Sequence, residues 1–196
     1  EQVIFAGFTH EPAAALAALI RARGPVSFDI FMDEALYGAA GGYYERGSAA
    51  IGREGDFYTA PDATPAFGWM LAEQIAECSA RLAENSIDIV ELGAGKGIMA
   101  ADILDRLAAD HRPLYERASY WIVERSRAMR EAQAASLRAH AERVRWAPDP
   151  DGIRAGGIVG CVLANEFYDA LPVRVVTRRG GVLLERRVAL AGAARG

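Results

Sequence analysis

The chain has 196 residues, 52% apolar and 24% charged, which is enough to bury the core of one substantial domain. Its formal net charge of -4 excludes the strongly basic surface typical of nucleic-acid-binding domains, so no nucleic-acid partner is expected. No apolar run reaches the roughly 18 residues of a membrane span, and no signal-peptide pattern opens the chain at Glu1. Cys78 and Cys161 stand in apolar helical and strand patterns, which predicts reduced core thiols.

Residues 1–86 are predicted to form an N-terminal helical segment with a glycine-rich loop. Helices are expected over 11–24 and over 27–38, the second with Ser27 as its N-cap. Residues 38–61 show no helical or strand period, and a loop of this length is usually functional or disordered. A longer helix is expected over 64–84, capped by Thr64. Its predicted buried stripe consists of Phe67, Met70, Leu71, Ile75, Cys78 and Leu82.

Residues 87–196 change to an alternation of strands and helices. Strands are expected over 87–92, 120–124, 143–147 and 157–165, with helices over 97–110 and 126–142. This order predicts an α/β fold with a parallel sheet and right-handed crossovers. Strands 173–179 and 182–190 around Gly180 and Gly181 predict a C-terminal β-hairpin. The sheet lacks the strands that usually follow, so we expect the N-terminal part of a longer protein, or a shortened version of one.

Three glycines follow the first strand in the segment IDIVELGAGKGI, residues 87–98. A phosphate loop is excluded because Gly97 follows Lys96, and the dinucleotide fingerprint fails because its third glycine is displaced by one position. A glycine turn before a helix lets a ligand lie against bare backbone. The sequence pattern acid-x-Gly-x-Gly-x-Gly resembles the first motif of Rossmann-like S-adenosylmethionine-dependent methyltransferases. In that reading Gly93, Gly95 and Gly97 line the cofactor, and Glu91 either caps the following amides or holds the methionine amino group.

Acidic residues follow the next two strands. Such methyltransferases are expected to end the second strand with an acid that accepts hydrogen bonds from the ribose hydroxyls, and Glu124 stands there. The alternative is a solvated acid at a helix start, favoured by the helix dipole. Asp149, after the third strand, is a candidate for the adenine amino group, although its segment APDPDG also reads as a plain turn.

The fourth strand ends in NEFYD, residues 165–169. Amino-directed methyltransferases often carry Asn-Pro-Pro-Tyr here, so Asn165 and Tyr168 match while Glu166 and Phe167 replace the prolines. Asn165, Glu166 and Asp169 are the catalytic candidates, because either carboxylate would hold a cationic acceptor. The alternative is a short capped helix whose Phe167 fills the core.

Four segments in this order closely resemble the MidA-like family, which includes the mitochondrial complex I assembly methyltransferase. They are GGYYERGSAAIGREGDFYTAPDATPAFG, VELGAGKG, WIVERS and VLANEFYDALPVR, between about Ser27 and Arg187. The resemblance implies a Rossmann-like class I methyltransferase fold, S-adenosyl-L-methionine as methyl donor and an arginine of a complex I subunit as acceptor. It also favours a lid over the cofactor in GDFYTAPD, with Phe57 and Thr59 as contacts, against a solvent-exposed turn.

The resulting hypothesis is a protein arginine methyltransferase with domains 1–86 and 87–196, in the bacterial cytoplasm or, in a eukaryote, the mitochondrial matrix. Two other hypotheses stay open, an NAD(P)-linked oxidoreductase and a non-catalytic assembly factor that binds the cofactor. His10, His111 and His140 share no ligand spacing, so no metal is expected. The pattern makes no prediction of oligomeric state.

Overall fold

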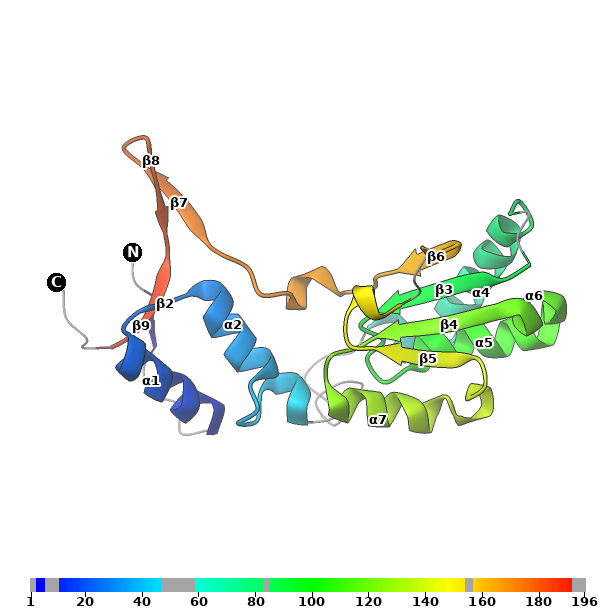
Figure 1. The fold of residues 1–196 in the computed structure, drawn as a ribbon, viewed down its shortest axis with the longest axis horizontal. Helices are drawn as coiled ribbons and strands as arrows, with labels where there is room; N and C mark the ends of the chain where they lie inside the picture. Colours follow the sequence, from blue (N-terminus) through cyan, green and yellow to red (C-terminus); the bar gives the residue numbers. More distant parts are fainter. Residues whose placement is uncertain (1–2, 6–10, 47–58, 83–84, 154–156, 192–196) are drawn as a thin grey trace. The chain divides into compact units, whose positions relative to one another are not determined.

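A computed structural model describes residues 3–5, 11–46, 59–82, 85–153 and 157–191 (Figure 1). Contacts divide the chain into two compact units, one of Gly47–Tyr168 and one that joins Glu1–Arg46 to Asp169–Gly196. This division does not coincide with the predicted boundary at residue 86, because strands near the C-terminus pair with strands near the N-terminus. None of the described helices combines the length and the apolar character that crossing a bilayer needs.

The unit of Gly47–Tyr168 contains a four-stranded parallel sheet in the order β5-β4-β3-β6 (Figure 1). The strands are β3 (Ile87–Leu92), β4 (Ala118–Val123), β5 (Val144–Ala147) and β6 (Gly160–Leu163). The predicted α/β fold with a parallel sheet is therefore confirmed. Chain order runs outward from β3 to β5 on one side and jumps to β6 on the other. A ligand in such a sheet binds outside the carboxyl ends of the strands at this switch point.

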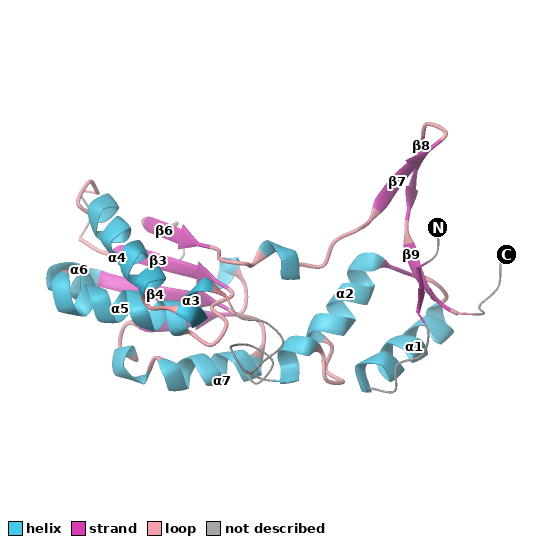
Figure 2. Ribbon diagram, turned by 180° about the vertical axis from the view of Figure 1, so that it is seen from behind, coloured by secondary structure: helices cyan, strands magenta, loops and turns pink. Residues whose placement is uncertain are grey.

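Helices α4 and α5 lie over one face of this sheet, in front of the strands in Figure 2. The helices of the unit are α3 (Ala60–Ala63), α4 (Ala66–Ser79), α5 (Ile98–Asp110), α6 (Arg112–Arg117) and α7 (Arg127–Ser136). Short 3-10 turns follow at η3 (Arg138–His140) and η4 (Pro150–Gly152). Alternate residues of β3 and β4, including Ile87, Ile89 and Ile122, face these helices and form the larger core with Ile103 and Leu107. Burial of this apolar area is the main source of stability.

The predicted stripe of α4 is wrong in part. Met70 is 71% exposed and Cys78 is exposed, whereas the buried face contains Gly68, Ala72, Ile75 and Ser79. A Cβ atom at Gly68 would lie 2.5 Å from the Cβ atom of Asp102, so small residues are required where α4 meets α5. The helix ends at Ser79, earlier than predicted, and its N-cap is Pro65 instead of the predicted Thr64. The Thr64 hydroxyl accepts from the Ala66 amide at 3.2 Å.

The second unit has a three-stranded sheet in the order β1-β9-β2. It is built from β1 (Val3–Phe5), β2 (Val26–Ser27) and β9 (Arg187–Leu190), with helices α1 (Glu11–Arg23) and α2 (Phe28–Tyr37) and turns η1 (Tyr43–Arg46) and η5 (Tyr168–Ala170). The predicted hairpin is confirmed as β7 (Val176–Arg179) with β8 (Val182–Glu185). The predicted strand over 182–190 is wrong as one element, because β9 leaves the hairpin to pair with β1 and β2.

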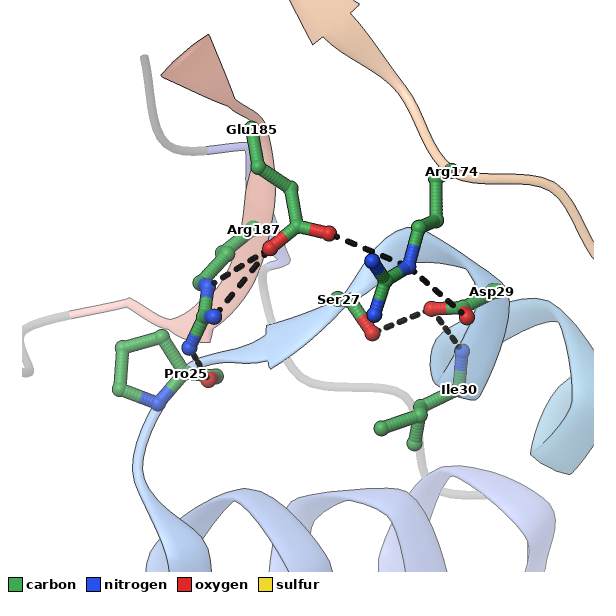
Figure 3. A network of polar contacts seen from close by, with 7 residues as sticks. All are labelled: Pro25, Ser27, Asp29, Ile30, Arg174, Glu185 and Arg187. Atoms are coloured by element: carbon green, nitrogen blue, oxygen red, sulfur yellow. Dashed lines mark hydrogen bonds and ion pairs between the residues drawn. The ribbon is translucent and has the colours of Figure 1, made fainter.

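An ion-pair network joins the hairpin to the start of α2 within this unit (Figure 3). The Arg174 guanidinium lies 3.5 Å from the Asp29 carboxylate and 3.4 Å from that of Glu185. Ser27 occupies the predicted N-cap position, but its hydroxyl donates to Asp29 and Asp29 accepts from the Ile30 amide. The hydrogen bond from Ser27 is the main reason that the pKa of Asp29 is lowered. The acid, and not the serine, therefore provides the capping acceptor.

His140 at the end of η3 links this turn to helices α5 and α6. Its ring is 6% exposed, with Nδ1 at 2.9 Å from the Tyr115 hydroxyl on α6 and Nε2 at 3.0 Å from the Asp105 carboxylate on α5. His140→Ala leaves both partners without this bond and opens a cavity, so we expect the free energy of unfolding in urea to fall by about 2–4 kcal/mol. His111→Ala is the control, because its pair with Glu73 is partly exposed and is worth at most about 1 kcal/mol. Equal losses for the two variants would contradict the prediction.

Candidate functional site

The backbone turns left-handed three times between β3 and α5. Gly93, Gly95 and Gly97 have φ angles of 68°, 53° and 80°. The Gly93 amide donates to the Val123 carbonyl at 3.0 Å and the Gly97 amide donates to the Ala94 carbonyl at 2.8 Å, so the turn is fixed at both ends. A side chain costs roughly 1–2 kcal/mol in this conformation, which explains the choice of glycine. The turn carries the first amides of α5 to the carboxyl edge of the sheet, where a helix N-terminus favours negative charge.

The three glycines have different surroundings. A Cβ atom at Gly93 would lie 2.8 Å from Cδ2 of Phe167, and one at Gly97 would lie 3.3 Å from a methyl group of Leu137. Among the residues that the structure describes, none has an atom within 4 Å of a Cβ atom at Gly95. Gly93 and Gly97 therefore allow close packing of the protein itself, whereas no described side chain packs on the backbone at Gly95.

Glu124 directly follows β4, next to this turn. Its Oε1 accepts from the Ser126 amide at 2.9 Å, and its Oε2 accepts from the Gln133 side-chain amide at 3.1 Å. The guanidinium of Arg130 donates to its main-chain carbonyl at 2.7 Å. The half-buried carboxylate thus has a defined orientation.

Gln133 on α7 is a site residue that the sequence analysis missed. Its side chain is fully buried and donates to the Gly95 carbonyl at 2.9 Å as well as to Glu124. The signal was present, since Gln133 stands four residues from both Met129 and Leu137 on the core-facing stripe of the helix. A polar residue in such a stripe is uncommon and needs partners.

Glu91 is 2% exposed and accepts from the Tyr120 hydroxyl at 2.7 Å. Burial raises the pKa of Glu91 to about 7, against the opposing effect of the hydrogen bond from Tyr120. Burial also raises the pKa of Tyr120, so the phenol stays the donor. Glu91 shares the helix-covered face of β3 with Ile87 and Ile89, which places it beneath the glycine turn.

The segment after β6 reaches the same glycine turn. Glu166 has a φ of 48°, a left-handed conformation that a non-glycine residue adopts at a cost. Phe167 packs over Gly93, and its ring meets that of Tyr168 edge-on with centroids 5.6 Å apart. Asn165 and Glu166 thus lie in a loop anchored beside the glycines. Asp169 starts the segment Asp169–Gly196 of the other compact unit, and its role stays a prediction.

Three other residues, Phe57, Thr59 and Asp149, are predicted to contact the cofactor. Phe57 lies outside the described residues. Thr59 caps α3, where its amide and hydroxyl both donate to the Asp62 carboxylate at 2.9 and 3.1 Å. Asp149 is exposed and its carboxylate accepts from the Gly152 amide at 3.0 Å. The plain turn that is the alternative to adenine binding is therefore present. The contacts of Thr59 and Asp149 with a cofactor stay predictions.

Comparison with known proteins identifies a family for this chain. The model of a family of S-adenosyl-L-methionine-dependent methyltransferases matches residues 70–195. The chain belongs to this methyltransferase family. It is 33% identical over 181 residues to protein arginine methyltransferase NDUFAF7, mitochondrial, of Bos taurus, covering 79% of this chain and 39% of the relative. The Danio rerio protein of the same name is 30% identical over 184 residues, covering 83% of this chain and 43% of the relative.

Solved structures support the family membership. A Burkholderia thailandensis protein, crystallised bound to S-adenosyl-homocysteine, is 32% identical with a TM-score of 0.77, covering 97% of this chain and 51% of that chain. A native structure from the same organism gives 31% identity and a TM-score of 0.70, with 97% and 49% covered. The predicted resemblance and class I methyltransferase fold are therefore confirmed. The chain spans about two fifths of the curated relatives and half of the solved chains.

The glycines of this methyltransferase motif differ in what an added methyl group would meet. Gly95→Ala strains the left-handed backbone and meets no described residue, so we expect a loss of about 1–2 kcal/mol in the free energy of unfolding. Gly93→Ala carries the same strain and must also displace the Phe167 ring, so its loss should be larger. Urea unfolding of both variants measures the difference. A smaller loss for Gly93→Ala than for Gly95→Ala would show that Phe167 does not pack there.

Glu91 should make the stability of the apoprotein depend on pH. Its folded pKa of about 7 lies above the ordinary value of 4.5, so the folded state binds the proton more tightly. The stability that this proton contributes is lost as the pH rises from about 4.5 to about 7. The loss is on the order of 3 kcal/mol. Glu91→Gln keeps an acceptor for Tyr120 and should remove this part of the pH dependence. The check is the difference between wild type and variant in urea unfolding from pH 4.5 to 8, and a constant difference would refute it.

Proposed function

We propose that the chain carries the cofactor half of an S-adenosyl-L-methionine-dependent methyltransferase that acts on a protein arginine. One observation carries the proposal. At the switch point of a parallel sheet, a left-handed glycine turn carries no described side chain over Gly95, and the adjacent strand is followed by the oriented carboxylate of Glu124. This is the arrangement that a nucleoside with free ribose hydroxyls requires. Membership of the methyltransferase family and the bound product in a similar structure support it.

Two acidic side chains near the glycine turn support the proposal that this part of the chain binds the cofactor. We propose that Glu124 accepts from the ribose hydroxyls, and that Gly93, Gly95 and Gly97 keep the backbone close to the ligand. Glu91 lies beneath the turn, where a cationic amino group would favour its ionised form. Asp149 is proposed for the adenine amino group, and Phe57 and Thr59 for a covering lid.

S-adenosyl-L-methionine, when bound, supplies an electrophilic methyl group. The acceptor nitrogen forms the new bond to the methyl carbon as the carbon–sulfur bond breaks, and the nitrogen gives up a proton. We propose that Asn165 and Glu166, in the loop anchored by Phe167, orient the acceptor, and that the Glu166 carboxylate holds a guanidinium and accepts the proton. Asp169 is proposed as a second carboxylate for the same cation.

The acceptor is proposed from the relatives. The curated proteins are named protein arginine methyltransferases, which supports a protein substrate with an arginine side chain. A complex I subunit as that protein rests on the family resemblance. The names of the relatives include the word mitochondrial, which supports a mitochondrial location if the chain is eukaryotic. The matrix, and the cytoplasm for a bacterium, are proposals from the family resemblance.

Glu124→Ala tests the ribose contact. Charge-assisted hydrogen bonds are worth about 1.5–3 kcal/mol each, so the affinity for S-adenosyl-homocysteine should fall at least about tenfold. Isothermal titration measures the affinity, and circular dichroism checks that the variant is folded. Glu131→Ala is the matched control, because Glu131 is exposed on α7 and pairs with Arg127. Unchanged affinity of Glu124→Ala would remove Glu124 from the ribose.

The same titration separates the other hypotheses. Binding of NAD(P) instead of S-adenosyl-homocysteine would overturn the methyltransferase proposal in favour of an oxidoreductase. Incubation with S-adenosyl-L-methionine labelled at its methyl group and a cell extract then tests turnover. Cofactor binding without labelled protein would support a non-catalytic module.

A further inference from the structure

The buried amide of Gln133 joins three parts of the site. Its Nε2 donates to the Gly95 carbonyl at 2.9 Å and to Oε2 of Glu124 at 3.1 Å, and its Oε1 accepts from the Trp146 indole at 3.0 Å. One side chain on α7 thus contacts the glycine turn, the end of β4 and strand β5. Its side chain is fully buried, so water does not replace these bonds cheaply.

Chemistry determines which way this amide points. The Gly95 carbonyl and the Glu124 carboxylate only accept hydrogen bonds at these positions, whereas the Trp146 indole only donates. A flipped amide would set its oxygen against two acceptors and its nitrogen against a donor. A glutamine satisfies two acceptors and one donor without adding charge, whereas a glutamate would place a second carboxylate beside Glu124.

These bonds fix the two ligand-facing groups relative to each other. Ser126 on the α7 side holds Oε1 of Glu124, and Gln133 holds Oε2, so both carboxylate oxygens are oriented from one helix. The Ser126 hydroxyl also caps α7 by accepting from the Met129 amide at 3.2 Å. The helix packs closely on the turn, because a Cβ atom at Gly97 would lie 3.5 Å from the Cα atom of Gln133. The rotamer of Glu124 therefore does not need to be selected by the ligand.

We propose that Gln133 is a positioning residue for the nucleoside, which holds the Glu124 carboxylate and the Gly95 carbonyl in the geometry that receives the ribose. This inference rests on the proposed function. Gln133 does not itself touch the ligand in this proposal, and it acts by orienting Glu124. A purely structural glutamine would affect the stability of the fold and leave the affinity of the folded protein unchanged.

A double-mutant cycle with S-adenosyl-homocysteine as the probe separates these roles. Gln133→Met keeps the volume of the side chain and removes its hydrogen bonds. We expect it to weaken binding about tenfold in the wild-type background and by less than about threefold in Glu124→Ala, because its effect passes through that carboxylate. Gln74→Met on α4 is the matched control, since Gln74 is exposed and its side-chain amide contacts Cys78 at 3.5 Å, outside the site.

Each outcome of the double-mutant cycle either supports or overturns the proposed role of Gln133. Equal affinity of Gln133→Met and wild type, or the same loss in both backgrounds, overturns the inference and leaves the proposed function standing. Absence of binding by the wild-type protein overturns both. Urea unfolding without ligand shows how much stability each variant loses, so affinity is compared only among folded proteins. If Gln133→Met does not fold, Gln133→Glu takes its place in the same cycle, where the added carboxylate should weaken binding by more than about tenfold.

Discussion

The left-handed turn between β3 and α5 is the constraint on which the site depends. Three residues adopt a positive φ there with little conformational strain because all three are glycine. The absence of side chains lets Phe167 approach Gly93 and Leu137 approach Gly97, while no described residue packs on the position of a Cβ atom at Gly95. The loop after β6 and the segment that follows α7 are therefore positioned against bare backbone.

Two glutamates at adjacent strand ends have different surroundings, and we propose different roles for them. Glu91 is enclosed under the helices with one hydroxyl partner, and burial raises its pKa toward neutrality. Glu124 is half-buried and held by a main-chain amide and a side-chain amide. A carboxylate held by donors is a ready acceptor for hydroxyl groups, whereas an enclosed one responds to any cation placed near it. This contrast supports the proposal that Glu124 binds the ribose and Glu91 responds to the amino group of the cofactor.

Local pattern predicted the central part of the fold well. The apolar runs at β3 and β4 and the glycine pair of the β7–β8 hairpin carry their structural information in a few adjacent residues. The stripe of α4 was less predictable, because large apolar residues such as Met70 are exposed while Gly68 and Ala72 face α5. Close approach of two helices selects small side chains, and hydrophobicity alone does not reveal which face approaches.

The sequence by itself determined the parallel sheet, the glycine turn, the acid near the end of β3 and the acid after β4, since each depends on neighbours within a few positions of the chain. Only the tertiary structure decided that Gln133 bridges Gly95 and Glu124, that Phe167 covers Gly93, and that β9 pairs with β1. These are contacts between residues far apart in the chain. They form because packing brings distant elements together, and no local periodicity encodes which partners will meet.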